Sequence, residues 1–121
     1  MKKIAVVEDN PDNRLLICAI LEDYYEINEY ETGLEAIKGL KKEVPSLILL
    51  DISLPGMDGP EVLKLLKEEE LTKDVPVIAI TAYAMAGDRE KYLKLGFDDY
   101  ITKPIIDEDL ILKSIKNLIN D

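Results

Sequence analysis

Four short, strand-like runs in this sequence each stop at a polar residue that can handle phosphate or a metal ion. One aliphatic run ends at Asp51 and another ends at Glu8-Asp9, while the remaining two stop at Thr81 and Lys103. In an open parallel α/β sheet the carboxyl ends of the strands gather at one edge, where ligands bind. If the runs are parallel strands, these residues converge on one acidic pocket that also holds a lysine and a hydroxyl.

The three carboxylates of this pocket suit a hard divalent cation. Glu8, Asp9 and Asp51 would lie on adjacent strands, where carboxylates repel one another and raise each other's pKa. A divalent cation relieves that repulsion, and Mg²⁺ prefers oxygen ligands with few protein carboxylates. The sequence therefore predicts a Mg²⁺ site. The alternative for any one of these residues alone is a solvated carboxylate at a strand end.

Asp51 is the best candidate for a nucleophile, because it follows a rigid, buried strand that holds its carboxylate in place. Carboxylates attack phosphoryl groups to form aspartyl phosphates. Phosphoryl transfer asks the protein mainly for positioning and charge neutralisation. Thr81 can donate a hydrogen bond to a phosphoryl oxygen, and Lys103 can pair with another as a point charge. Taken alone, the threonine would be a turn residue and the lysine a surface residue.

The composition limits the remaining classes of function. A chain of 121 residues fits one domain, residues 1–121, and its net charge of -10 argues against a free-standing nucleic-acid binder. No apolar run is long enough to cross a membrane. The single cysteine, Cys18, rules out an intrachain disulfide and is consistent with a reducing cytoplasm. The chain contains no histidine, so any chemistry must use carboxylates, hydroxyls, lysine or an oxygen-ligated metal.

Hydrophobic spacing predicts five alternations of strand and helix. The predicted strands are residues 3–7, 24–30, 46–50, 75–80 and 98–101. The first predicted helix begins near residue 11, and the next four span residues 33–43, 60–70, 85–95 and 107–120. Asn10 is the expected N-cap of the first helix and Gly96 the expected end of the fourth. Apolar residues follow helical spacing at Leu15, Leu16, Ala19 and Ile20 in the first helix. The predicted inner face of the last helix consists of Leu110, Ile111, Ile115, Leu118 and Ile119.

The strands predict an α/β fold with a doubly wound, five-stranded parallel sheet and five helices. The third and fourth strands are apolar at successive positions, which is typical of strands covered by helices on both faces. The second strand is more polar, with Glu26, Asn28 and Glu29, and suits an edge. Right-handed crossovers then favour the strand order 2-1-3-4-5, the flavodoxin-like arrangement.

Five motifs in order give the chain a close resemblance to a known family. They are 7–10 (VEDN), 32–36 (TGLEA), 49–59 (LLDISLPGMDG), 80–82 (ITA) and 96–104 (GFDDYITKP). Together they resemble the receiver domain of bacterial two-component response regulators, of the single-domain, CheY-like or phosphorelay type. The resemblance covers essentially the whole chain.

The resemblance implies a phosphorylation-dependent signalling switch. Asp51 would accept a phosphoryl group from the phosphohistidine of a sensor histidine kinase or a phosphotransfer protein. Mg²⁺, the only cofactor expected, would be organised by Glu8, Asp9, Asp51 and the backbone carbonyl of Ser53. Thr81 and Lys103 would bind the phosphoryl group, and Tyr100 would report its presence by rotating. The signal would pass by contact with a downstream protein, without DNA binding, membrane insertion or turnover of an external substrate.

Two features depart from the family pattern or are left open by it. The family usually has two aspartates where this chain has Glu8-Asp9, so Glu8 reaches the metal either directly or through a water. Ser53 and Tyr83 lie two residues beyond Asp51 and Thr81, and the resemblance implies that these positions tune how fast water removes the phosphoryl group.

The first helix and the loop after Lys103 flank the predicted pocket. We therefore expect a partner helix bundle to dock on an exposed face formed by Asn13, Leu16, Ile17 and Pro104.

Three other classes compete with this interpretation. A haloacid dehalogenase-like phosphatase would also use a strand-end aspartate with Mg²⁺, but it needs a second aspartate at the position of Ser53. A flavodoxin-like binding module would need a phosphate-cradling loop after the first strand, where this chain is acidic. A pseudo-receiver that signals without phosphorylation would not need the full acidic set and Lys103.

Overall fold

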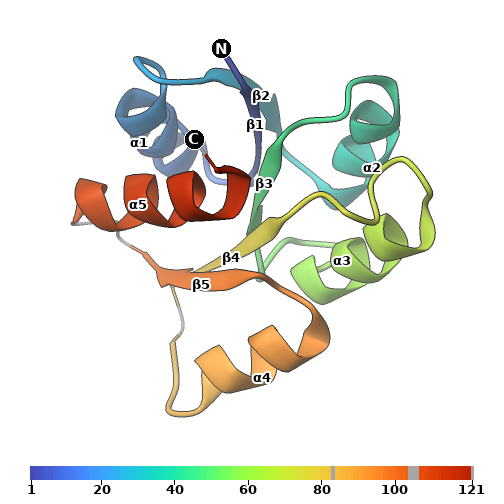
Figure 1. The fold of residues 1–121 in the computed structure, drawn as a ribbon. Coiled ribbons are helices and arrows are strands. Elements are labelled where there is room, and N and C mark those ends of the chain that lie inside the picture. The colour runs from blue at the N-terminus through green and yellow to red at the C-terminus, as the bar shows by residue number, and fades with distance from the viewer. Residues whose placement is uncertain (83, 104–106, 121) are drawn as a thin grey trace.

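The computed structural model describes residues 1–82, 84–103 and 107–120. Within them, five strands alternate with five helices (Figure 1). The strands are β1 (Lys3–Val7), β2 (Glu26–Tyr30), β3 (Leu47–Asp51), β4 (Val77–Thr81) and β5 (Asp99–Thr102). The helices are α1 (Pro11–Leu21), α2 (Gly33–Lys42), α3 (Gly59–Glu68), α4 (Asp88–Leu95) and α5 (Glu108–Ile119).

The five strands form one parallel sheet in the order β2-β1-β3-β4-β5, which confirms the predicted topology. Every residue of β3 and β4 is buried, as expected of central strands with helices on both faces. The polar strand β2 lies at one edge, and β5 lies at the other. Figure 1 shows α1 and α5 on one face of the sheet, α2 and α3 on the other, and α4 beyond β5.

The alternation of side chains along each strand divides the core into two layers. The layer beneath α1 and α5 includes Ile4, Val6, Leu47, Leu49, Ile78, Ile80 and Ile101. The layer beneath α2 and α3 includes Ala5, Val7, Ile48, Leu50, Val77, Ala79 and Tyr100. Continued past the strand ends, this alternation assigns Glu8, Asp51 and Lys103 to the α1–α5 side. Thr81 falls on the other side, with Tyr100.

Side-chain caps fix where most of the helices begin. The Asn10 side chain accepts hydrogen bonds from the backbone amides of Asp12 and Asn13 at 2.9 and 3.1 Å, and Pro11 occupies the first turn, as predicted. Thr32, Asp58 and Asp107 cap α2, α3 and α5 in the same way. Helix α3, which follows the loop after Asp51, therefore begins at a fixed residue.

Several predicted element boundaries were wrong by one to three residues. Strand β2 starts at Glu26, because Tyr24 and Tyr25 belong to the turn that follows α1. Strand β4 runs on to Thr81 and β3 on to Asp51, so both of these residues end a strand instead of following one. Helix α4 starts at Asp88 because its N-cap, Gly87, has left-handed backbone angles.

Two predicted helix faces also needed correction. In α1 the core contacts come from Ile17, Ile20 and Leu21, whose spacing of three and four residues puts them on one face. Leu15, Leu16 and Ala19 lie on the outside of this helix. In α5, Ile111 and Ile115 are buried, but Leu110 is exposed.

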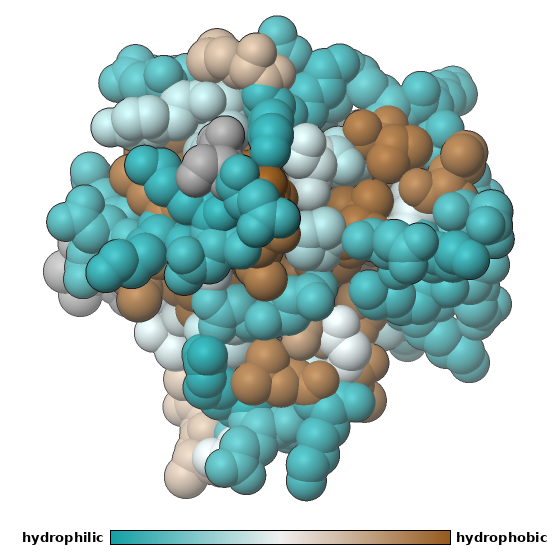
Figure 2. Space-filling model, viewed as in Figure 1, coloured by the Kyte–Doolittle hydropathy of each residue, from teal (hydrophilic) through white to brown (hydrophobic). Residues whose placement is uncertain are grey.

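The face of the molecule that is drawn in Figure 2 is largely polar. Figure 2 shows a hydrophilic face interrupted by small apolar patches. None of the helices in the described part of the chain is long and apolar enough to cross a membrane.

Candidate phosphoryl-acceptor site

The register of the sheet brings Glu8 and Asp51 together. Val7 of β1 pairs with Leu50 of β3, so the residues that follow them are neighbours at the carboxyl edge. Glu8 and Asp51 are both buried, whereas Asp9 is exposed. One carboxylate oxygen from each of the three residues lies within 4.8 Å of the others. The predicted convergence of the three acidic side chains is therefore confirmed.

Lys103 forms ion pairs with both buried carboxylates. Its Nζ lies 2.6 Å from Oε1 of Glu8 and 3.1 Å from Oδ2 of Asp51, and its own side chain is only 10% exposed. Removing charges from water is costly, and a buried carboxylate is tolerated only when it is paired and hydrogen-bonded. Lys103 therefore holds together the ends of β1, β3 and β5.

Burial dominates the electrostatics of Glu8. The pKa of Glu8 is raised from 4.5 to about 7, mainly by loss of solvent and in addition by the adjacent Asp51, while the hydrogen bond from Lys103 acts in the opposite direction. Burial alone would lower the pKa of the Lys103 amine. The hydrogen bonds and charges of Glu8 and Asp51 outweigh that effect, so the pKa of Lys103 is raised overall.

The backbone of the β3–α3 loop orients Asp51. The amide of Ser53 donates to Oδ1 of Asp51 at 2.9 Å, while Oδ2 faces Lys103. The loop closes tightly, because the amide of Gly59 donates to the carbonyl of Ile52 at 2.9 Å. A Cβ at Gly59 would lie 2.7 Å from the carbonyl oxygen of Asp51, a distance that real Cβ atoms essentially never show. Position 59 therefore requires glycine.

A cavity of about 210 Å³ opens over these groups. Its lining residues are Glu8, Asp9, Asn10, Asn13, Asp51, Ser53, Ala82 and Lys103. Thr81 is buried at the end of β4, one residue before Ala82, and the amide of Lys103 donates to its carbonyl at 2.7 Å. The structure therefore brings Thr81 to the border of the site, while Ala82 contributes to the lining.

Tyr100 lies away from the cavity, in the core layer beneath α2 and α3. Its side chain is buried, and its hydroxyl has no hydrogen-bond partner in the described structure. Burial, together with the nearby Asp88 and Tyr92, raises the pKa of the Tyr100 phenol. Tyr100 therefore occupies a buried, inward position in this structure.

The donor set fits Mg²⁺. All the nearby ligand atoms are hard oxygens, two of the three carboxylates are held rigidly, and the third, on Asp9, is accessible from solvent. Three carboxylates, from Glu8, Asp9 and Asp51, lie around the single ammonium group of Lys103, so the described pocket holds more negative than positive charge. A divalent cation would relieve that excess.

The predicted docking face is only partly exposed. Ile17 is 1% exposed and packs in the core, so the prediction that it contributes to a docking surface is wrong. Leu16 is exposed, as predicted, and Asn13 is partly exposed and lines the cavity. Pro104, and also Tyr83, lie outside the described residues.

The sequence interpretation missed Arg14. Its guanidinium donates to the carbonyl of Glu8 at 2.8 Å and contacts Glu29 and Glu31 at 3.5 and 3.2 Å. It thereby ties α1 to the end of β1 and to strand β2. Its position four residues after the N-cap Asn10 was the only feature of the sequence that could have pointed to this contact. A backbone carbonyl that accepts a hydrogen bond cannot be identified from residue types.

The fold and the site together define a doubly wound α/β protein with an acidic pocket at the carboxyl edge of its sheet. The response regulator receiver domain family matches residues 4–116, and the chain belongs to this family. It is thus a receiver domain of two-component signalling.

Two relatives show how differently such a domain is used. The chain is 40% identical over 121 residues to the polar-differentiation response regulator DivK of Brucella ovis, covering 99% of this chain and 98% of DivK. It is 38% identical over 112 residues to the sensor protein GacS of Pseudomonas syringae pv. syringae. That match covers 89% of this chain but only 12% of GacS.

Solved structures share the fold. The receiver domain of the sensor histidine kinase PA1611 from Pseudomonas aeruginosa PAO1 is 32% identical, with a TM-score of 0.89 over 99% of this chain and 98% of that one. That structure has a magnesium ion coordinated in its active-site cleft. A CheY-like receiver domain protein from Methanospirillum hungatei is 31% identical, with a TM-score of 0.85 and coverage of 99% and 94%.

Proposed function

We propose that Asp51 accepts a phosphoryl group from a phosphohistidine on a partner protein, in a reaction that requires Mg²⁺. The observation that supports this most strongly is the buried Asp51 carboxylate, which has Lys103 at 3.1 Å and two further carboxylates beside it at an open cavity. Residues 1–121 contain no histidine, so the donor group lies outside them.

In the proposed step an oxygen of Asp51 attacks the phosphorus of the donor. A new P–O bond forms as the N–P bond to the imidazole breaks, and the electron pair of that bond leaves with the imidazole nitrogen. Lys103 pairs with a phosphoryl oxygen, and the hydroxyl of Thr81 donates to another. Positioning and charge neutralisation are the main demands of such a transfer, and neither needs a general base.

Glu8, Asp9, Asp51 and the carbonyl of Ser53 would hold the Mg²⁺. When bound, the ion supplies positive charge that offsets the repulsion between the acceptor and the incoming phosphoryl oxygens. Oε1 of Glu8 already lies 2.6 Å from Lys103. This contact favours binding of Glu8 to the metal through a water, because the lysine occupies one of its two oxygens.

Phosphorylation would act on Tyr100 through Thr81. The phosphoryl group adds about two negative charges at Asp51. Thr81 and Tyr100 belong to the same side of the sheet, and the residue two before Thr81, Ala79, pairs with Tyr100. A movement of Thr81 toward the phosphoryl group would therefore change the packing beside Tyr100 and bias its position.

We propose a sensor histidine kinase or a histidine phosphotransfer protein as the donor, and a protein as the downstream target. Asn13 and Leu16, together with Leu15, which is 70% exposed, would form the docking face beside the cavity. Residues 1–121 would act as a single cytoplasmic receiver domain that turns over no external substrate.

Intact-mass measurement after incubation with acetyl phosphate and Mg²⁺ tests the central proposal. We expect an increase by the mass of one phosphoryl group, which EDTA abolishes. Asp51→Asn should show no adduct. Asp74→Asn removes the charge of an exposed aspartate between α3 and β4, and this variant should be phosphorylated to the same extent as the natural sequence.

A short-lived adduct would escape this measurement, so binding of beryllofluoride in the presence of Mg²⁺ should be followed by the chemical shifts of the backbone amides around Asp51. The proposal is wrong if neither an adduct nor a beryllofluoride complex forms. It is equally wrong if the adduct persists in Asp51→Asn.

A further inference from the structure

Asp9 differs from the other two carboxylates that could hold Mg²⁺. Glu8 is fixed at both oxygens, because Oε1 pairs with Lys103 at 2.6 Å and Oε2 accepts from the amide of Asn10 at 3.2 Å. Asp51 is fixed in the same way, by Lys103 and a backbone amide of the loop that follows it. The Asp9 side chain is exposed, and its oxygens have no hydrogen bond or ion pair within the described residues. Its position therefore depends on the backbone that carries it.

Arg14 holds that backbone on both sides of Asp9. Nη1 of its guanidinium donates to the carbonyl of Glu8 at 2.8 Å and to the carbonyl of Asp9 at 3.3 Å. These carbonyls belong to the two peptide groups that flank the Cα of Asp9. Because a peptide group is planar, fixing both carbonyls limits the two backbone torsions of Asp9. Rotation of its own side chain is then the main freedom left to the Asp9 carboxylate.

Arg14 is itself held by acidic residues at the edge of the sheet. Its Nε lies 3.5 Å from Oε1 of Glu29, and its Nη2 lies 3.2 Å from Oε1 of Glu31. The Arg14 side chain is only 14% exposed, although both glutamates are more than half exposed. A planar guanidinium serves several acceptors in fixed directions at once, which a lysine ammonium does not. Arg14 therefore connects strand β2 rigidly to the turn that carries Asp9.

We propose that Arg14 is a positioning residue for the Mg²⁺ site, which sets the place of the Asp9 carboxylate through the backbone on either side of it. Arg14 is not among the residues that line the cavity, so it acts through Glu8 and Asp9. Residues outside the ligand shell that orient metal ligands commonly change metal affinity by about 10- to 100-fold when they are replaced. The inference rests on the proposed function, because it concerns the Mg²⁺ that the reaction requires.

The charge of Arg14 and its positioning role act on Mg²⁺ binding in opposite directions. A guanidinium near the site repels a cation, so loss of the charge alone should strengthen Mg²⁺ binding. Loss of the two carbonyl contacts frees the turn around Asp9, and ordering this turn when the ion binds costs conformational entropy. Binding should then weaken. The sign of the change in affinity therefore separates the two effects.

Titration of the full chain with Mg²⁺, followed by the chemical shifts of the backbone amides of residues 9, 51 and 53, measures the affinity of the folded protein. Arg14→Gln should bind Mg²⁺ about tenfold more weakly than the natural sequence, although it has lost a positive charge. Arg14→Lys should also bind more weakly, because lysine keeps the charge but cannot serve both carbonyls and both glutamates. Arg14→Lys carries the test if Arg14→Gln does not fold.

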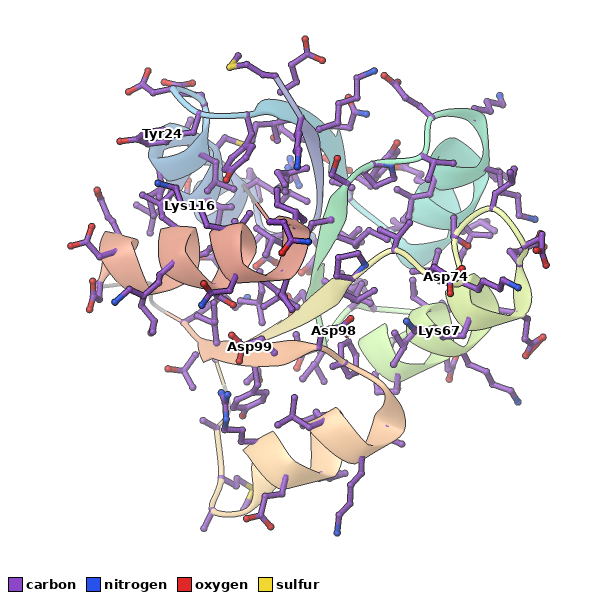
Figure 3. The ribbon with its side chains drawn as sticks, viewed as in Figure 1. Tyr24, Lys67, Asp74, Asp98, Asp99 and Lys116 are labelled. Atoms are coloured by element: carbon purple, nitrogen blue, oxygen red, sulfur yellow. The ribbon has the colours of Figure 1, made fainter. Side chains whose placement is uncertain are left out.

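Lys116→Gln is the charge-matched control. Lys116 is exposed in the last turn of α5, where Figure 3 labels it. The end of this helix lies beside the amino end of β1, because Nζ of Lys2 donates to the carbonyl of Ile119 at 2.9 Å. The proposed metal site lies at the opposite, carboxyl end of the strands, so Lys116→Gln should leave the Mg²⁺ affinity unchanged.

Mg²⁺ binding by Arg14→Gln that is as tight as in the natural sequence, or tighter, would overturn the inference. If urea denaturation in EDTA showed the same variant to be less stable, the role of Arg14 would be structural only. Equal weakening in Lys116→Gln would overturn the inference as well. If the natural sequence bound no Mg²⁺, the proposed function would be refuted together with this inference, whereas binding that is unaffected by both Arg14 variants would refute the inference alone.

Discussion

The proposed phosphoacceptor edge, where Glu8, Asp51 and Lys103 meet, and helix α4 are held by opposite means. At the edge, Glu8 and Asp51 are buried and paired with a lysine that is only 10% exposed. In α4 nothing is buried, and Arg89, which pairs with Asp99 of β5 at 2.9 Å, is 60% exposed. The proposed chemistry requires fixed atoms, whereas the proposed switch requires an element that moves at low cost. The two regions that differ in this way lie at different places along the edge strand β5.

The contrast follows from what water does to charges. An exposed ion pair contributes little, because solvent screens it and the side chains lose freedom. A buried pair is costly to assemble, but breaking it by removing one partner costs far more, because the other charge stays buried. Lys103 is therefore structurally essential, while Arg89 only biases a local equilibrium.

The largest expected effect comes from removing the buried cation. Lys103→Met should lower the free energy of unfolding by about 3 kcal/mol at about pH 8 in EDTA, because Glu8 and Asp51 are left buried and uncompensated. Urea denaturation measures this. Mg²⁺ should restore part of the loss, since it supplies the missing positive charge.

Lys94→Met removes a lysine from α4 instead and should cost less than about 0.5 kcal/mol, as surface substitutions usually do. Similar losses in the two variants would show that the two regions are held alike, and the comparison would fail.

The pH dependence of the free energy of unfolding should show the cost of burying the Glu8 carboxylate in its charged form. Its pKa in the folded protein, about 7, lies above its ordinary value of 4.5, so its contribution to stability is complete below pH 4.5 and is lost as pH rises through 7. The natural sequence should therefore lose about 2 kcal/mol relative to Glu8→Gln between about pH 5 and pH 8 in EDTA.

Glu35→Gln provides the control, because this carboxylate is exposed at the start of α2. It should follow the pH dependence of the natural sequence. If Glu8→Gln also followed the pH dependence of the natural sequence, burial of the charged Glu8 carboxylate would not be costly. The argument that the site needs a cation would then lose its physical basis.

Much of the site could be predicted from the sequence, because the end of a buried strand can be recognised where an apolar run gives way to a polar residue. An aliphatic run followed by a carboxylate fixes both the strand and the edge at which it stops, so Glu8, Asp9 and Asp51 could be placed together. The continuous apolar runs of β3 and β4, the polar character of β2 and the preference for right-handed crossovers were sufficient for the strand order.

Contacts between elements could not be predicted in the same way. The inner face of α1 was misplaced because seven of its eleven residues are apolar, so hydrophobic spacing does not distinguish Ile17 from Leu16. The contact of Lys103 with both Glu8 and Asp51 depends on the exact geometry of three strand ends. The stack of Tyr92 on Tyr100 depends on how α4 lies over β5, and the weakly apolar helix gave no signal of it.

The smallest expected effect concerns the hydroxyl of Tyr100. Tyr100→Phe keeps the ring that stacks on Tyr92 and removes a buried hydroxyl that has no partner. It should raise the free energy of unfolding by about 1 kcal/mol, measured by urea denaturation, because the desolvation cost disappears and no hydrogen bond is lost. Tyr24→Phe is the control, since the Tyr24 side chain is half exposed, and it should change stability by less than about 0.5 kcal/mol.

A stabilising Tyr100→Phe would have a consequence for the comparison of the two regions. It would mean that the Tyr100 hydroxyl weakens the attachment of α4, whereas Lys103 strengthens the contacts between the strand ends at the proposed acceptor site. Hydrogen exchange of residues 88–95 should then slow in Tyr100→Phe. A destabilised variant would instead show that the hydroxyl has a favourable partner, and the weak attachment of α4 would then follow from its lack of buried residues alone.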